Sequence, residues 1–229
     1  MFLEAKNALI FKKGNETLMI EPWGENSLRV RSTLDPNFID RDWALTEKIN
    51  HGNAKVSVTE NGASIVNGKI EAKLNNNGII TFYKDGEKIL HEYHRSYDPS
   101  ATKESCCTKV INRQWQGIIG GDYKLSVRFE SNDSEKIFGM GQYQTPYLDM
   151  KGCFLELAQR NSQISIPFAV SNLGYGFLWS TSNCSCKVFY NFCRSVFGCN
   201  PVIHFFCTFC NPFCNIFCKI NVTNCWIIP

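Results

Sequence analysis

The last fifty residues of this chain contain neither aspartate nor glutamate. Residues 180–229 carry three charged side chains, Lys187, Arg194 and Lys219, whereas residues 1–179 carry 21 Lys and Arg against 21 Asp and Glu. Nine of the 12 cysteines and eight of the 17 phenylalanines fall in the same last fifty residues. Because ordinary globular domains draw about a quarter of their residues from charged types, we expect the chain to change character near residue 179.

Strong net charge and long apolar runs are also missing. The net charge of +3 is too small to indicate a nucleic-acid or anionic-membrane surface. The first residues lack the apolar core and cleavage site of a signal peptide. Asn200-Pro201 and Asn211-Pro212 keep the apolar stretches below the roughly twenty residues that a membrane helix needs. We therefore expect no nucleic-acid partner, no membrane span and a cytoplasmic location, where disulfides do not ordinarily form.

Arrangements that could bind a metal are scarce. His91 and His94 are three residues apart near the end of an expected strand, which directs them to opposite sides. Cys207 and Cys210 have the spacing of half a zinc site, but no second pair follows at the proper distance. We predict no metal and no cofactor, and a zinc-binding tail stays open as an alternative.

Helical periodicity is absent as well, and short strands and turns replace it. Short apolar runs recur about every ten residues, separated by pairs such as Asn67-Gly68, Asn77-Gly78 and Asp85-Gly86 that favour tight hairpin turns. Ser27–Thr33 alternates apolar residues with arginines, which predicts a half-buried antiparallel strand. Residues 96–121 break the rhythm and predict a long surface excursion or a loop that lies against another part of the protein. The sequence up to residue 179 thus predicts an all-β sandwich.

The segment from Glu135 to Trp179 holds the most specific motifs. An apolar strand ends in Gly139-Met140-Gly141, which lacks the third glycine and following helix of a phosphate loop. The two glycines instead predict a close backbone approach or a tight turn beside a cleft. Gln159-Arg160-Asn161 follows, and the strand Ile166–Ser171 and the strand Gly174–Trp179 then form a hairpin.

These motifs, in this order, resemble the N-terminal β-sandwich of glycoside hydrolase family 31, the α-glucosidases and α-xylosidases. The resemblance covers residues 1–179 and implies an antiparallel β-supersandwich, galactose-mutarotase-like in its fold, followed in 180–229 by an irregular Cys/Phe-rich tail. The family pattern breaks at Ser180, where its catalytic barrel would follow after a further strand. We interpret the tail as a disordered segment or as the product of an out-of-frame reading.

The resemblance also implies a function. Family 31 enzymes are retaining α-glycosidases of carbohydrate metabolism whose two catalytic aspartates lie on the barrel, so the resemblance assigns no catalytic residue to this chain. Asp149 and Glu156 cannot replace them unless the chain folds back between them, since seven residues along a strand span about 23 Å. By resemblance, Arg160, Asn161 and Gln163 contact the substrate, an α-linked oligosaccharide, when the barrel is present, although Asn161 stands where many relatives carry Asp. Tyr143 and Tyr147 are aromatics that could stack on a sugar ring.

A free-standing carbohydrate-binding sandwich is the alternative to an inactive part of a glycosidase. If the chain is a truncated glycosidase, the sandwich face that would pack on the barrel is left apolar and open, which predicts poor solubility.

Overall fold

The computed structural model describes residues 1–5, 7–38, 53–95, 109–119, 123–158, 160–180, 185–191, 202–208 and 222–228, the last three ranges as backbone only. All regular secondary structure in these residues is β-strand, which confirms the all-β prediction. The strands are β1 (Phe2–Ala5), β2 (Ala8–Lys13), β3 (Glu16–Trp23), β4 (Ser27–Thr33), β5 (Lys55–Thr59), β6 (Gly62–Asn67), β7 (Ile70–Asn75), β8 (Ile80–Lys84), β9 (Glu87–His91), β10 (Arg113–Gly117), β11 (Tyr123–Glu130), β12 (Ile137–Gln142), β13 (Phe154–Leu157), β14 (Ile164–Ser171), β15 (Tyr175–Ser180), β16 (Ser185–Asn191), β17 (Val202–Thr208) and β18 (Val222–Ile228).

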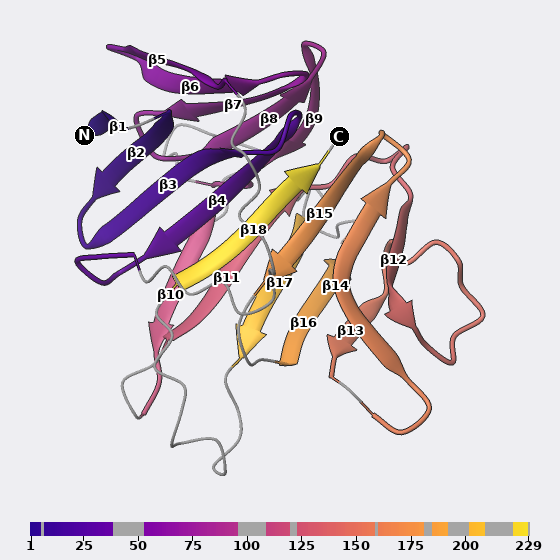
Figure 1. Ribbon diagram of the computed structural model, residues 1–229. Coiled ribbons are helices and arrows are strands. Elements are labelled where there is room, and N and C mark those ends of the chain that lie inside the picture. The colour runs from indigo at the N-terminus through magenta and orange to yellow at the C-terminus, as the bar shows by residue number, and fades with distance from the viewer. Residues whose placement is uncertain are drawn as a thin grey trace, which may run out of the picture.

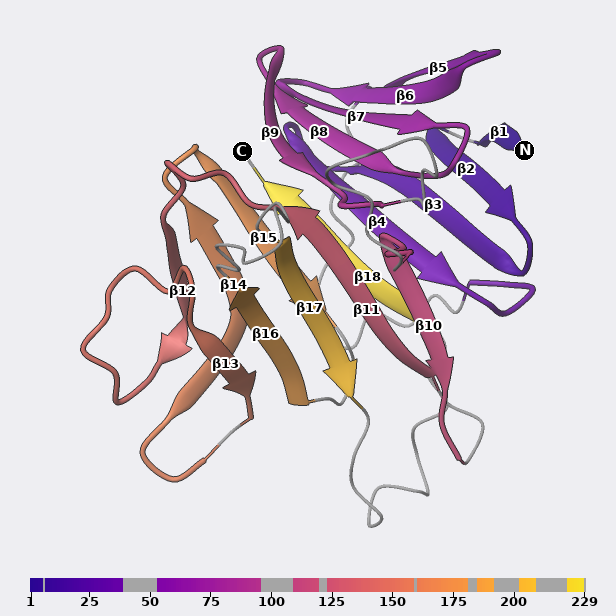
Figure 2. The same ribbon diagram turned by 180° about the vertical axis from the view of Figure 1, so that it is seen from behind.

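The strands form one large and two smaller antiparallel sheets. The large sheet has eight strands in the order β1-β2-β3-β4-β18-β15-β14-β12, and the smaller sheets run β5-β6-β7-β8-β9 and β10-β11-β17-β16-β13. Figure 1 shows the β5–β9 sheet across the β1–β4 half of the large sheet. The sheet of β10, β11, β17, β16 and β13 lies behind the other half. Figure 2, from behind, brings β10, β11, β17 and β16 to the front. The molecule is thus a two-layer sandwich, one layer of which is divided in two.

Hairpin chemistry and alternation account for the β5–β9 sheet. Ile70, Ala72 and Leu74 of β7 are buried while the residues between them face outward, as expected for a strand with one wet face. Asp85 and Gly86 both have positive φ, 49° and 85°, which is the geometry of a tight two-residue hairpin loop between β8 and β9.

The centre of β4 departs from the prediction of a half-buried strand. Arg29 and Arg31 are 3% and 7% exposed, because β4 is an inner strand of the large sheet and both arginines lie within ion-pair distance of Glu21 on β3. The Arg29 guanidinium also lies 4.8 Å from the Trp23 ring centre. Both faces of β4 are therefore covered, and the prediction was wrong on this point.

The core lies where the three sheets meet. A cavity of about 30 Å³ there is lined by residues of all three sheets, among them Val30, Phe82, Phe129 and Trp179. Phe129 of β11 packs edge-on against Phe177 of β15, with ring centres 5.6 Å apart. The segment 96–121, expected to be an irregular excursion or loop, contains the edge strand β10, so that prediction was wrong for residues 113–117. Residues 96–108 and 120–121 of that segment lie outside the described residues.

Three strands fall in the segment that the sequence predicts to be an irregular tail. β18 pairs with β4 on one side and β15 on the other, while β16 and β17 lie between β13 and β11. The stretches between these strands lie outside the described residues, and the boundary at residue 179 and the out-of-frame interpretation stay predictions. A membrane-crossing helix is absent from the described residues, all of whose regular elements are strands.

Candidate functional site

The turn between β13 and β14 carries the predicted substrate-contacting residues. Arg160 and Gln163 form an isolated antiparallel bridge, and the Gln163 N–H donates to the Arg160 carbonyl oxygen at 3.2 Å. Between them, Asn161 is exposed and Ser162 has a positive φ of 80°. The tight turn therefore gathers all three predicted residues within one connection, which leads from β13 in the smaller sheet to β14 in the large sheet.

The Arg160 guanidinium has one ionic partner in the described residues, Glu156. Glu156 lies four residues earlier on β13, and its carboxylate accepts a hydrogen bond from Nη2 of Arg160. The Arg160 side chain remains 58% exposed. An exposed pair of this kind adds little stability, but it holds the guanidinium at the open side of the turn, where its other N–H groups can reach a ligand.

A hydrogen-bonded chain fixes the base of the turn. The Tyr143 hydroxyl donates to Ser165 Oγ at 3.0 Å, and Ser165 Oγ donates to the Ala158 carbonyl oxygen at 3.0 Å. These two bonds tie the loop after β12 to the residues before and after the turn. Partial burial raises the pKa of the Tyr143 phenol, an effect that the bond to Ser165 opposes, so Tyr143 stays a neutral donor at ordinary pH.

A backbone bulge in β12 lies opposite the first residues of β14, directly after the turn. The β12–β14 register shifts between Gly139 and Gly141, and Gly139, Met140 and Gly141 all have positive φ. An added Cβ on Gly141 would lie 2.0 Å from the Ile164 carbonyl oxygen, and one on Gly139 would lie 2.7 Å from that of Phe168. The predicted close backbone approach is confirmed, and the bulge directs Met140 into the core, where it is 2% exposed.

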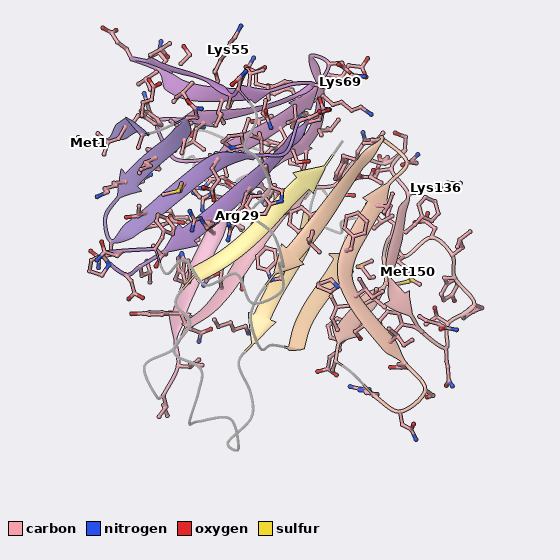
Figure 3. All side chains as sticks on the ribbon, viewed as in Figure 1. Met1, Arg29, Lys55, Lys69, Lys136 and Met150 are labelled. Atoms are coloured by element: carbon pink, nitrogen blue, oxygen red, sulfur yellow. The ribbon has the colours of Figure 1, made fainter. Side chains whose placement is uncertain are left out.

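The two tyrosines near the turn have different environments. Tyr143 packs partly against the core and uses its hydroxyl on Ser165, so its ring is a poor platform for a ligand. Tyr147 is 62% exposed and lies in the loop between β12 and β13. Figure 3 places Met150, later in that loop, beside β12, where its N–H donates to the Ile137 carbonyl oxygen at 2.7 Å. Only Tyr147 of the pair offers a free aromatic face.

The nearby carboxylates accept hydrogen bonds from backbone N–H groups and from Arg160 of the turn. Asp149 Oδ1 accepts hydrogen bonds from the backbone N–H groups of Ile137 and Lys151, both at 3.0 Å, and Glu156 holds Arg160. Among the described residues, no group of three or more His, Cys, Asp or Glu side chains could hold a metal ion. Cys207 lies on β17, but its side chain and Cys210 lie outside the described residues, so the zinc alternative stays a prediction.

An exposed apolar face begins at the turn; the sequence analysis expected such a face on the sandwich but did not assign it to any strand. On one side of β14, Ile164, Ile166 and Val170 are 54%, 50% and 40% exposed, while the small residues Ser165, Ala169 and Ser171 of the other side are buried. Phe168 lies between Ile166 and Val170 on the outer side and pairs with Leu178 of β15. We call these four β14 residues the β14 apolar face. Strict alternation of large apolar and small residues in ISIPFAVS was the signal that could have revealed it.

Known proteins resemble both the sequence and the structure. The chain is 41% identical over 189 residues to an uncharacterized family 31 glucosidase of Pseudescherichia vulneris, a match that covers 78% of this chain and 35% of the relative. An alpha-xylosidase A of Aspergillus niger is 27% identical over 201 residues and is covered to 26%. A crystal structure of a family 31 alpha-xylosidase from a soil metagenome, complexed with xylose, superposes with a TM-score of 0.82 at 37% identity, covering 100% of this chain and 32% of that chain.

This chain belongs to glycoside hydrolase family 31. It corresponds to an N-terminal part of its family 31 relatives and spans about a third of the length of the glucosidase and the soil-metagenome xylosidase. The resemblance inferred from the sequence motifs is therefore confirmed, and so is the sandwich fold. No family model matches the chain.

Proposed function

We propose that this chain is the sugar-contacting N-terminal part of a retaining α-glycosidase that acts on α-linked oligosaccharides. The observation that carries the proposal is the position of the Arg160–Gln163 turn at the end of the β14 apolar face. Contiguous exposed apolar surface marks an interaction site. A catalytic domain packed on that face would have the turn at the edge of the contact, next to its substrate.

The chemistry of the turn suits a neutral sugar. Arg160 supplies charged N–H donors, while the amides of Asn161 and Gln163 can each both donate to and accept from a hydroxyl group. The exposed ring of Tyr147 on the neighbouring loop is available for stacking. Together these groups would fix a sugar ring in position without taking part in bond cleavage.

The chain alone is expected to be inactive. Retaining hydrolysis needs two carboxyl groups about 5–5.5 Å apart, one as nucleophile and one as acid/base. Asp149 and Glu156, the carboxylates nearest to the turn in sequence, are engaged by backbone N–H groups and by Arg160 respectively. We propose that both catalytic groups lie in the part of the relatives that this chain does not match.

The division at residue 179 belongs to the same proposal. The sequence match to the glucosidase covers 78% of the chain, the share that residues 1–179 make up of 229. The share matched in sequence is the size expected of a family 31 segment that ends near residue 179, whereas the structural match to the soil-metagenome xylosidase extends over the whole chain. A cytoplasmic location is part of the proposal and rests on the sequence alone.

A chimera tests the proposal. Residues 1–179 would replace the matching part of the Pseudescherichia vulneris glucosidase, and hydrolysis of 4-nitrophenyl α-glucoside and α-xyloside would be measured. We expect activity in the chimera and none in the 229-residue chain. Within the chimera, Arg160→Ala should raise KM about tenfold with a smaller change in kcat, because it removes binding shared by the ground and transition states.

Lys136→Ala provides the matched control, since Lys136 is an exposed cation away from the turn. Hydrolysis by the purified 229-residue chain would overturn the assignment of catalysis to the missing part. An active chimera whose KM does not respond to Arg160→Ala would overturn the role of the turn.

A further inference from the structure

The outer face of the β5–β9 sheet has a groove that the proposed glycosidase site does not use. The groove is open, has a volume of about 320 Å³ and extends over β5 to β8. Its volume is at the lower end of the range for small-molecule sites, about 300–1,000 Å³. Figures 1 and 2 place this sheet beside β1–β4, at the opposite side of the large sheet from β14 and β12.

One row of paired residues forms the long side of the groove. Ser57, Ser64, Lys73 and Thr81 are successive register partners across β5, β6, β7 and β8, so their side chains share the outer face. Within the described part of the chain, the hydroxyls of Ser57 and Ser64 make no hydrogen bond. Two hydroxyl groups therefore stand opposite each other with their donors and acceptors available to a ligand.

A glycine turns this polar face into a hollow. In the next row, Gly62 lies between Thr59 and Asn75, and it leaves a floor without a side chain. A Cβ on Gly62 would lie 2.3 Å from the Leu74 carbonyl oxygen, so the backbone requires glycine here. The Asn75 amide is oriented by its Oδ1, which accepts from the N–H groups of Asn77 and Ile79 at 3.0 Å each. Its NH₂ group is left as a donor at the edge of the hollow.

The charge balance favours a neutral ligand over an anion. Lys73 is the one charged residue among those that line the groove. Its ammonium group lies 3.4 Å from Glu71 Oε2 and 4.6 Å from the centre of the Tyr83 ring. Both contacts offset the positive charge. Hydroxyl and amide groups around a neutralised cation match the hydroxyls of a sugar better than they match a phosphate.

We propose that this groove is a second carbohydrate site that holds a neutral oligosaccharide away from the Arg160–Gln163 turn. The choice of a sugar as ligand rests partly on the proposed glycosidase function, whereas the neutral, hydroxyl-binding character follows from the groove itself. Such a site would keep a long substrate attached to the protein while another part of it is processed.

Titration of the purified 229-residue chain with maltotriose and isomaltotriose, followed by calorimetry and ligand-observed NMR, tests this inference. Ser64→Tyr should fill the groove and weaken binding about tenfold or more. Val66→Tyr places the same side chain two residues further along the same face of β6, outside the groove lining, and should leave binding unchanged. Arg160→Ala should also leave binding at the groove unchanged.

Each result separates the two sites. Loss of binding in Ser64→Tyr with retention in the other two variants supports the groove. Loss of sugar binding in Arg160→Ala alone is compatible with the proposed function but overturns the groove as a sugar site. An absence of saturable sugar binding to the wild-type chain also overturns the groove. Saturable binding of inorganic phosphate that Ser64→Tyr removes would overturn the neutral-ligand assignment. If Ser64→Tyr unfolds the chain, the double variant Ser57→Ala/Ser64→Ala, which only removes hydroxyls, should still weaken sugar binding measurably.

Discussion

At the scale of single residues, Arg113 joins all three sheets. It belongs to β10, and its Nη1 donates to both carboxylate oxygens of Glu92, each at 2.5 Å, just after β9. Its Nε donates to Glu16 at the start of β3 at 2.7 Å, and its Nη2 to the Gly78 carbonyl oxygen at 2.6 Å. The Arg113 and Glu92 side chains are 5% and 2% exposed. Removal of the arginine would leave a carboxylate buried without a counter-charge.

Arg113→Met is therefore expected to lower the free energy of unfolding by about 3–5 kcal/mol at pH 7. Burial alone would raise the pKa of Glu16, but the charge of Arg113 and the hydrogen bonds from Ser32 and Arg113 outweigh it and lower that pKa. The resulting stabilisation is complete above the ordinary pKa of a Glu side chain, 4.5. It is lost as the pH falls through the lowered pKa of Glu16 in the folded protein. The difference between wild type and variant, measured by urea unfolding, should thus narrow below pH 4.5.

Arg128→Met is the matched control, because Arg128 on the adjacent strand donates to the Ile111 carbonyl and to Gln114 rather than to a carboxylate. Arg128→Met should lower the free energy of unfolding by only about 1 kcal/mol. A pH-independent cost for Arg113→Met would mean that packing of the side chain, and not its charge, holds the sheets together.

At the scale of elements, the bulge in β12 faces the residues of β14 that directly follow the Arg160–Gln163 turn. Gly141→Ala should destabilise the protein by roughly 2–4 kcal/mol, because φ is +110° and the new Cβ would clash with the Ile164 carbonyl oxygen. Thermal and denaturant unfolding would measure the loss. Gly117→Ala in β10, where nothing lies within 4 Å of the added Cβ, should change stability by less than about 1 kcal/mol. Equal effects of the two substitutions would contradict the close approach.

Strands and hairpin turns were predictable because their signals are local. The Asp85-Gly86 loop has the positive φ values that its residues favour. Burial was less predictable, because it depends on which sheet a strand joins. Arg29 and Arg31 looked like the wet side of β4 but are covered in the large sheet. β14 shows the reverse, since its large apolar residues face outward and its serines and alanine face the core. Arg113 lay in a stretch that the sequence assigned to a surface loop, and no local pattern indicates its two glutamate partners.

At the scale of the whole molecule, the β14 apolar face predicts self-association of the chain when no further domain covers it. Substituting both Ile166 and Val170 by Thr keeps β-branched residues on the strand but removes exposed apolar surface. We expect the double variant to weaken concentration-dependent association about tenfold or more in sedimentation velocity. Val58→Thr, which changes a side chain 47% exposed on β5, should leave association unchanged. A monodisperse wild-type chain at high concentration would contradict this prediction.

The position of β18 has a consequence for how the molecule is made. In the large sheet, β18 stands between β4, formed early in the sequence, and β15. During translation, β4 and β15 are therefore synthesised before β18, and until then each has one unpaired edge. Such distant pairing gives the sheet a high contact order, which slows folding. The large sheet can close only after residue 228 has been synthesised. Until then the nascent chain exposes two open strand edges, which favour aggregation.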